Sequence, residues 1–277
     1  MILFENIAIV GTGLIGGSLA LAIKKYKLCK RIIGVCRHKS SEIIAQKMGI
    51  FYRVSRSLKD INDAECVIVA TPPSVCYEIA PLIAKIVKPE VIISDVSSTK
   101  ENIVKEFEKY FNFYLGSHPL AGSEKRGIIY ANAELFKGSI CIVTPTKKTN
   151  LTAKKKIVQL WKMVGCNVVE MSAEKHDKIL GRLSHLPHAI AFSLMNIITK
   201  EESKLAPPSF KEMTRIAGSD ANLWSDIFLE NKSALLSAMD SFEKKFLFFK
   251  KAIYEKNKFL LRKIIFSAKR KREGFLK

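Results

Sequence analysis

Gly11-Thr12-Gly13-Leu14-Ile15-Gly16 is a glycine-rich motif near the start of the chain, and the predicted fold follows from it. It follows an apolar run at residues 7–10 that is typical of a buried parallel strand, and it precedes residues 18–23, which have the composition of a helix. A GxGxxG motif between a strand and a helix is the context in which this motif binds a dinucleotide. The first glycine allows the tight turn, the second lets the backbone approach a pyrophosphate, and the third lets helix and strand pack closely. We therefore expect a dinucleotide here, with the helix N-terminus facing the phosphates, rather than a purely structural turn.

Strand and helix patterns alternate from this turn to about residue 171. Apolar runs predict further buried strands, and most are followed by a stretch of helical composition. This alternation predicts a doubly wound, Rossmann-type parallel sheet with right-handed crossovers. The strands are expected at residues 7–10, 32–35, 66–70, 91–95, 113–116, 140–143 and 168–169, and the helices at 41–48, 75–86, 102–110 and 154–164.

Strand-like runs disappear after about residue 172. Helices are expected near residues 174–200, 209–217, 222–240 and 241–267. The sequence thus predicts an α/β protein with a dinucleotide-binding domain at residues 1–171 and an all-helical domain for substrate binding and dimerisation at residues 172–277. Helical domains joined to nucleotide-binding domains often dimerise, so by analogy we expect a homodimer. Its candidate interface is an apolar helix face that includes Phe242, Phe246, Phe249, Ile253, Leu260 and Ile264.

Composition is ordinary for a globular protein of 277 residues, apart from a formal net charge of +20. Residues 244–277 hold thirteen Lys or Arg and two Asp or Glu, and so carry +11 of this charge. The cluster Lys269-Arg270-Lys271-Arg272 would suit nucleic acid or a membrane, but a solvated lysine-rich surface explains it as well, and we expect neither partner. No apolar run of about 18 residues predicts a membrane span.

None of the six cysteines belongs to a CxxC pair, and several lie in apolar runs. We expect reduced, mostly buried thiols of a cytoplasmic protein rather than zinc ligands or a disulfide framework. No metal site is predicted.

The end of the second predicted strand bears on the choice of cofactor. NAD-binding motifs usually carry an acidic residue there, which binds the ribose 2′-hydroxyl. This chain has Cys36 at that place, followed by Arg37-His38-Lys39. A 2′-phosphate would suit Arg37, which favours NADP, whereas NAD stays open if Arg37 only stacks on the adenine. Thr71 and Pro72, directly after another predicted strand, are further expected cofactor contacts.

Chemistry-bearing residues gather in four segments, two of which follow predicted strands. Loops at the carboxyl ends of strands face the cofactor crevice in such sheets. The segments are DVSSTK (95–100), HPLAGSEKRG (118–127), HD with SHLPH (176–188), and TRIAGSD running to a tryptophan (214–224). In the third segment, His185 and His188 share a helix face, which Pro187 would kink.

Together with GTGLIGGSLA (11–20), these segments in this order resemble the prephenate dehydrogenase family of tyrosine biosynthesis, which includes the arogenate and cyclohexadienyl dehydrogenases. The resemblance extends to about residue 250. It implies NAD(P)-dependent oxidative decarboxylation of prephenate to 4-hydroxyphenylpyruvate, in which the cofactor takes a hydride from the ring carbon that bears the hydroxyl. Loss of the ring carboxylate as CO₂ leaves an aromatic ring. The protein therefore needs only to take the hydroxyl proton, hold two carboxylates and place the ring.

The resemblance implies three principal site residues. His118 matches the catalytic histidine, whose neutral imidazole accepts the hydroxyl hydrogen bond and its developing proton. Ser98 matches the serine that shares this contact, and its alternative role is to cap the following helix. Arg215 matches the arginine that binds a substrate carboxylate with its planar fork, and its alternative is an ion pair on a helix surface.

Further matches surround the expected substrate. His188 matches a histidine of the substrate pocket, and Ser123 and Glu124 lie in the loop beside the substrate. His176, Asp177 and His185 match residues that shape or support the pocket. For His176 and Asp177, a structural role at the start of a helix is an equally good explanation. For His185, packing in the core is favoured.

The substrate stays open between prephenate and arogenate, which differ by a keto against an amino group. Arogenate-specific relatives tend to lose the second histidine of SHLPH, which this chain keeps as His188, whereas Arg37 favours the NADP that arogenate enzymes often use. A β-hydroxyacid or imine dehydrogenase would instead use a lysine on the helical domain and would not need HPLAG. A nucleotide-sensing or nucleic-acid-binding protein would leave His118, Ser98 and Arg215 unexplained.

Overall fold

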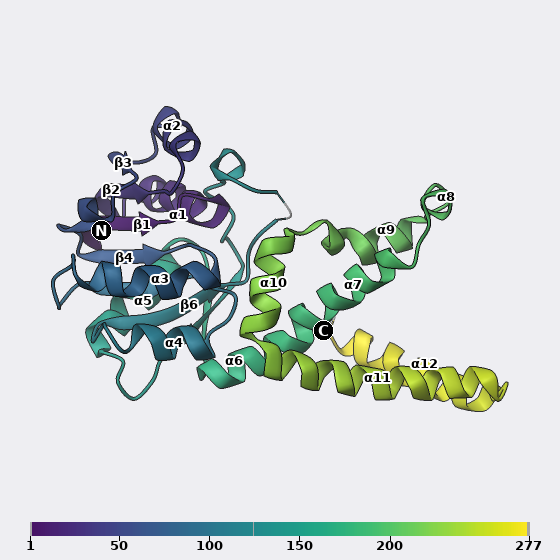
Figure 1. The fold of residues 1–277 in the computed structure, drawn as a ribbon. Helices are drawn as coiled ribbons and strands as arrows, with labels where there is room; N and C mark the ends of the chain where they lie inside the picture. Colours follow the sequence, from purple (N-terminus) through teal and green to yellow (C-terminus); the bar gives the residue numbers. More distant parts are fainter. Residues whose placement is uncertain (1, 124, 276–277) are drawn as a thin grey trace. The chain divides into compact units, whose positions relative to one another are not determined.

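An eight-stranded sheet forms the centre of the computed structural model, which describes residues 2–123 and 125–275 (Figure 1). The strands lie in the order β3-β2-β1-β4-β5-β6-β7-β8. Their bounds are β1 Phe4–Val10, β2 Cys29–Val35, β3 Arg53–Ser55, β4 Cys66–Val69, β5 Ile92–Asp95, β6 Tyr114–Pro119, β7 Ile140–Thr144 and β8 Asn167–Glu170.

The predicted α/β, Rossmann-type sheet is confirmed, but one strand pair departs from the expected all-parallel arrangement. β6 and β7 are antiparallel, with Gly116 opposite Thr144 and Pro119 opposite Cys141. Parallel neighbours need a crossover, usually a helix. The described residues between these strands contain only a short 3₁₀ turn, Ile128–Tyr130, so the chain returns antiparallel.

Two strands differ in detail from the prediction. β3 was not predicted, because its three residues hold one apolar side chain, Val54, and give no periodic signal. The sequence predicted that His118 lies on the loop after β6. Instead, β6 continues to Pro119, so His118 lies within the strand. The cause is β7, which pairs with β6 up to Pro119 and extends it.

Helices cover both faces of the sheet and give it two hydrophobic cores (Figure 1). Ile7 and Ile9 of β1 belong to the core under α1, α2 and α5, whereas Ala8 and Val10 belong to the core under α3 and α4. Successive strand residues point to opposite faces, so a strand buried on both sides is apolar throughout. These helices are α1 Leu14–Lys25, α2 Lys39–Lys47, α3 Pro73–Ala84, α4 Glu101–Phe107 and α5 Leu151–Met163.

The turn between β1 and α1 requires glycine at two positions. Gly11 has φ +104°, and a Cβ there would lie 2.3 Å from the carbonyl oxygen of Ala70. A Cβ at Gly16 would lie 2.0 Å from the carbonyl oxygen of Gly11. The turn is therefore pressed against the end of β4, and α1 is pressed against the turn.

The helical segments begin at Ala173. Instead of one helix at 174–200, α6 (Ala173–Leu180) passes through a π-helical turn (Gly181–His185) into α7 (Leu186–Asn196). Pro187 lies in the first turn of α7, where proline is tolerated, and the wider π turn precedes it. The chain continues through α8 Lys200–Ser203, α9 Pro208–Thr214, a 3₁₀ turn at Arg215–Gly218, and α10 Ala221–Glu230.

The chain forms two compact units, Met1–Asn231 and Lys232–Lys277. The second consists of α11 (Lys232–Tyr254) and α12 (Lys258–Gly274). The helix break expected between residues 240 and 241 is wrong, because α11 is continuous there and the chain turns at Lys256, with φ +50°. The domain boundary expected after residue 171 stays a prediction. Among the described residues, no helix combines the length and apolar character needed to cross a membrane.

Candidate active site

The carboxyl ends of four neighbouring parallel strands bring the predicted segments to one edge of the sheet. The glycine turn follows β1, Thr71 and Pro72 follow β4, and the DVSSTK segment begins at the end of β5. His118 is the penultimate residue of β6, the next strand along. Ligands bind at this edge in sheets of this kind, so the arrangement defines the candidate site.

The glycine turn fits the pyrophosphate of a dinucleotide. A Cβ at Gly13 would meet no atom within 4 Å, so the space above this residue is open. α1 begins directly after Gly13, at Leu14 and Ile15, with no side-chain cap and no acidic residue in its first turn. The first N–H groups of a helix need acceptors, and a phosphate group supplies them.

The end of β2 carries a cation rather than a carboxylate. Cys36 is buried, and its Sγ lies 3.7 Å from the carbonyl oxygens of both His38 and Ser55, so the thiol points into the protein. The side chain of Arg37 is exposed. The residues directly after β2 therefore present an exposed cation and no carboxylate.

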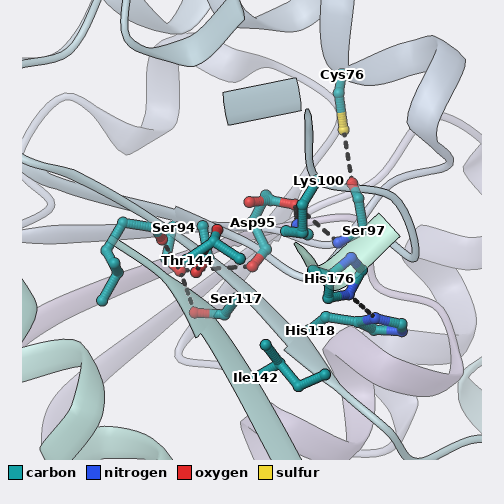
Figure 2. A network of polar contacts seen from close by, with 12 residues as sticks. Cys76, Ser94, Asp95, Ser97, Lys100, Ser117, His118, Ile142, Thr144 and His176 are labelled. Carbon is teal, nitrogen blue, oxygen red and sulfur yellow. Dashed lines mark hydrogen bonds and ion pairs between the residues drawn. The ribbon is translucent and has the colours of Figure 1, made fainter. Parts of the chain in front are cut away.

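His118 begins a buried chain of contacts that ends at Asp177. Nδ1 of His118 lies 2.8 Å from Nε2 of His176 (Figure 2), and Nδ1 of His176 lies 2.7 Å from Oδ1 of Asp177. His118 is the most exposed of the three side chains, at 9%. α6 carries the other two residues, and its N-cap is Ser172, whose hydroxyl accepts a hydrogen bond from the N–H of Lys175.

The order of these contacts assigns the protons. The Asp177 carboxylate accepts, so His176 donates from Nδ1 and, as a neutral ring, accepts at Nε2. His118 then donates from Nδ1 to His176, and the lone pair of its ring lies on Nε2. A neutral imidazole whose acceptor nitrogen, Nε2, is not engaged by His176 is suited to act as a general base.

Burial keeps this group of histidines neutral. Burial, and then the neighbouring His176, Lys100 and His185, hold the pKa of His118 well below its ordinary value. Burial also lowers the pKa of His176, against the opposing effect of its hydrogen bond to Asp177. The pKa of His185 is lowered to about 4, again chiefly by burial. Perturbed groups of this kind cluster at functional sites.

A buried ion pair lies beside the histidines. The ammonium of Lys100, which is 0% exposed, pairs with the carboxylate of Asp95 at the end of β5 (Figure 2). The same carboxylate accepts hydrogen bonds from the Tyr114 hydroxyl at 2.7 Å and from the N–H of Ser97 at 2.8 Å. The Ser97 hydroxyl lies 3.4 Å from the thiol of Cys76, so the network reaches α3.

Ser98 is half-buried in the loop between β5 and α4. It does not cap α4, whose N-cap is Lys100 and which lacks a side-chain cap from its own N-cap residue. Asp177 supplies the cap instead, because its oxygens accept hydrogen bonds from the N–H groups of Lys100 and Glu101, each at 2.8 Å. The capping alternative for Ser98 is therefore wrong.

His188 and Arg215 lie on neighbouring helical segments. The His188 ring stacks on Trp224 of α10, with centroids 3.4 Å apart and an interplanar angle of 19°. Nδ1 of His188 donates to the carbonyl oxygen of Ser184 at 2.9 Å. Burial lowers the pKa of His188 against this hydrogen bond, and the charge of Arg215 lowers it further. The Arg215 side chain is exposed and near enough to His188 to act on it electrostatically.

The loop after β6 reaches the same helical segments. Arg126 forms an ion pair with Asp220, which also caps α10 through a 2.8 Å hydrogen bond from the N–H of Leu223. Ser123 is exposed, and its hydroxyl accepts a 3.1 Å hydrogen bond from the N–H of Lys125. Glu124, which was expected beside the substrate, lies outside the described residues.

Two family models match this chain. One, described as "Prephenate dehydrogenase, nucleotide-binding domain", matches residues 19–170, and the other, "Prephenate dehydrogenase, dimerization domain", matches residues 172–265. This chain belongs to the prephenate dehydrogenase family. It is 36% identical over 255 residues to the cyclohexadienyl dehydrogenase of Zymomonas mobilis, covering 87% of this chain and 86% of that protein. It is 35% identical over 247 residues to the prephenate dehydrogenase of Bacillus subtilis, covering 85% and 67% respectively.

Solved structures agree with this assignment. The prephenate dehydrogenase of Aquifex aeolicus, crystallised with hydroxyphenyl propionate and NAD⁺, matches with a TM-score of 0.93 and 34% identity and covers 98% of each chain. The arogenate dehydrogenase of Synechocystis shares the fold, with a TM-score of 0.84 at 22% identity, covering 98% of this chain and 100% of that one.

The geometry adds residues that the sequence did not single out. Lys100 and Asp95 were quoted within DVSSTK without a role, although an acidic residue at a strand end five positions before a lysine is the available signal. His176 and Asp177 were left open between helix-start structure and pocket support, and they contact both His118 and the start of α4. Across residues 2–123 and 125–275, no cluster of three or more His, Cys, Asp or Glu side chains is arranged to hold a metal ion.

Proposed function

We propose that this chain catalyses the oxidative decarboxylation of prephenate to 4-hydroxyphenylpyruvate in tyrosine biosynthesis. The glycine turn at Gly11–Gly16 would hold NAD(P)⁺, which would supply the acceptor for the hydride that leaves the ring carbon bearing the hydroxyl. The bond to the ring carboxylate breaks, CO₂ leaves, and the electron pair makes the ring aromatic. Prephenate and the oxidised cofactor thus give 4-hydroxyphenylpyruvate, CO₂ and the reduced cofactor, with no net release of a proton.

The chain's own residues handle the proton and the two carboxylates. Nε2 of His118 accepts the proton of the ring hydroxyl as the carbon–oxygen bond gains double-bond character, and returns it to the oxygen once the ring is aromatic. Ser98 shares the contact with the hydroxyl. Arg215 holds a substrate carboxylate with a bidentate fork, and His188 lines the pocket. Ser123 and Glu124 are proposed substrate contacts, as the resemblance to the family implies.

The observation that carries this proposal is the placement of His118. It lies at the carboxyl edge of the sheet, on the same edge as the glycine turn, with its Nδ1 bonded to His176 at 2.8 Å and its Nε2 lone pair left for a substrate hydroxyl. The family of the chain supports the same reaction, because its relatives carry the names prephenate and cyclohexadienyl dehydrogenase.

Initial rates of nicotinamide reduction test the proposal and its finer parts together. The purified chain is given prephenate or arogenate, each with NAD⁺ and with NADP⁺. We expect turnover with prephenate, because the chain keeps His188, and a higher kcat/KM with NADP⁺, because Arg37 stands where NAD-binding motifs carry a carboxylate. Turnover with arogenate alone would favour the arogenate reaction, and silence in all four combinations from folded protein would contradict the proposal.

Removal of the Arg215 guanidinium is expected to weaken substrate binding. A lost charge-assisted contact is worth roughly 1.5–3 kcal/mol, so Arg215→Ala should raise the KM for prephenate by about 10- to 100-fold. Steady-state kinetics measure this, with Arg53→Ala as the matched control, because Arg53 lies on β3 and pairs with Asp60 at 2.8 Å. An unchanged KM for prephenate would move the carboxylate site elsewhere.

The pH dependence follows from the lowered pKa of His118. The base must be neutral, and a lowered pKa keeps it neutral down to more acidic pH. We therefore expect kcat/KM for prephenate to stay level from about pH 8 down to about pH 6 and to fall only below that. Rates measured in buffers of constant ionic strength, with enzyme-free blanks at each pH, test this. A fall centred at pH 7 or above would contradict a buried, neutral His118.

The helical part of the chain is proposed to join two copies in a homodimer. The family model that matches residues 172–265 is described as a dimerization domain. On α11, the rings of Phe242 and Phe246 stack with centroids 5.8 Å apart and are 40% and 58% exposed. Ile253 is 54% exposed, whereas Phe249 is half-buried. These apolar side chains suit a second copy of the chain as their partner.

A further inference from the structure

Both oxygens of the Asp177 carboxylate are committed to neighbouring groups. Oδ1 accepts hydrogen bonds from the N–H of Lys100 at 2.8 Å and from Nδ1 of His176 at 2.7 Å. Oδ2 accepts from the N–H of Glu101 at 2.8 Å. Asp177 is 4% exposed and His176 is 0% exposed, so water screens this contact little.

The reaction under the proposed function sets a particular demand on the base. In the proposed reaction His118 accepts the hydroxyl proton and returns it to the product oxygen, so that no proton is released overall. The site therefore needs a group that stabilises the imidazolium where it forms, not one that carries the proton away. The Asp177 carboxylate supplies such a negative charge. It is separated from His118 by the imidazole ring of His176, and it accepts hydrogen bonds from three donors.

The other charged and titratable groups around His118 do not supply it. Lys100, from the loop before α4, is a cation and disfavours the imidazolium. Asp95, at the end of β5, is paired with that lysine and with Tyr114. His185, in the π-helical turn, contacts the side-chain amide of Asn231 at 3.0 Å, and Cys141, on β7, is a buried thiol whose pKa is raised chiefly by burial.

We infer that Asp177 is a positioning residue that stabilises protonated His118 through His176. It fixes the His176 ring with Nε2 toward His118, and its negative charge offsets the positive charge that His118 gains during turnover. By capping α4 with the same carboxylate, it also fixes the loop that carries Ser98 relative to His118. This inference rests on the proposed function.

Two substitutions test the inference by different routes. Asp177→Asn removes the charge, whereas His176→Asn places an amide nitrogen where Nδ1 lies, so it keeps a donor to Asp177 and removes the contact with His118. Each is expected to lower kcat by about 10- to 100-fold, a part of what a general base contributes, with the KM values for prephenate and cofactor within about threefold of wild type. Because Asp177 and His176 act on His118 through the same chain of hydrogen bonds, the kcat of the double variant should be little lower than that of the more impaired single variant.

The acid limb of kcat/KM separates this role from a structural one. Loss of the anion disfavours the imidazolium, so the pKa of His118 falls and the acid limb moves to lower pH, by about 0.5–1 unit. Asn150→Ala is the control for lost capping, because Asn150 caps the distant α5 through hydrogen bonds of 2.8 Å and 3.1 Å. It should lower thermal stability and leave kcat and the acid limb unchanged.

Failure of this inference and failure of the proposed function would give different results in these experiments. Absence of turnover in the wild-type chain would refute the proposed function itself. If wild type turns over prephenate, an unchanged kcat in His176→Asn overturns the inference, even where Asp177→Asn fails to fold. An unmoved acid limb in folded Asp177→Asn overturns it as well. A kcat loss that is additive in the double variant, with no shift of the acid limb, likewise overturns it.

Discussion

In the His118→Asn variant, kcat for prephenate is expected to fall by about two decades or more. The asparagine amide nitrogen lies where Nδ1 of the ring lies, so the hydrogen bond to His176, now 2.8 Å long, can be kept. What the variant lacks is the lone pair of Nε2, and with it the group that accepts the hydroxyl proton. The loss therefore falls on the transition state, and the KM for prephenate and the affinity for the cofactor should change little.

Steady-state kinetics and a direct cofactor titration measure the two parts of this expectation. Circular dichroism and thermal melting of the same sample show that the variant is folded. Near-normal turnover by folded His118→Asn would remove His118 from the role of base, and a large rise in KM at constant kcat would reassign it to substrate binding.

The second large effect is expected on stability. Lys100→Met leaves the Asp95 carboxylate buried without its cation, with only the Tyr114 hydroxyl and the N–H of Ser97 as donors. Breaking a buried pair on one side costs about 3–5 kcal/mol in the free energy of unfolding. Removing both charges, in the double variant Asp95→Asn and Lys100→Met, should recover part of that loss, because no unpaired charge is then buried.

Urea denaturation of wild type, both single variants and the double variant measures these differences. A loss below about 1 kcal/mol in Lys100→Met would mean that the pair adds little to stability. Activity gives a second readout: Lys100 lowers the pKa of His118, so its removal should move the acid limb of kcat/KM to higher pH. Asp177→Asn moves the same limb in the opposite direction, which separates the two charges.

The central strands β1 and β4 could be predicted from the sequence, because they are almost fully buried between the two helical layers and are therefore mostly apolar. The glycine turn could be predicted from the GxGxxG motif between a strand and a helix, and the structure gives the physical reason for its first glycine, because a side chain at Gly11 would clash with Ala70. The direction of β7 could not be predicted, because apolar periodicity is the same for parallel and antiparallel strands. The division expected between residues 240 and 241 was wrong, because α11 runs without interruption from Lys232 to Tyr254 and exposed aromatic residues such as Phe242 and Phe246 continue its helical pattern.

The site was predictable in part, because some of its features follow from a local sequence pattern and others depend on contacts between residues far apart in the sequence. His118 could be placed at the sheet edge because a strand pattern leads directly into it. Its contact with His176 spans 58 residues, and the contact of Asp177 with Lys100 spans 77, so neither is encoded in a local pattern. Burial of the Lys100 ammonium runs against the usual exposure of lysine and depends on Asp95 being placed beneath it by β5.

The balance of products formed from prephenate is a stringent test of the proposed reaction. Purified chain is incubated with prephenate and a limiting amount of oxidised nicotinamide cofactor, and 4-hydroxyphenylpyruvate, CO₂ and reduced cofactor are measured in the same sample. We expect one equivalent of each product per prephenate consumed, and no net proton uptake or release beyond the hydration of CO₂. Reduced cofactor without CO₂, or no reduction by folded protein, would contradict it.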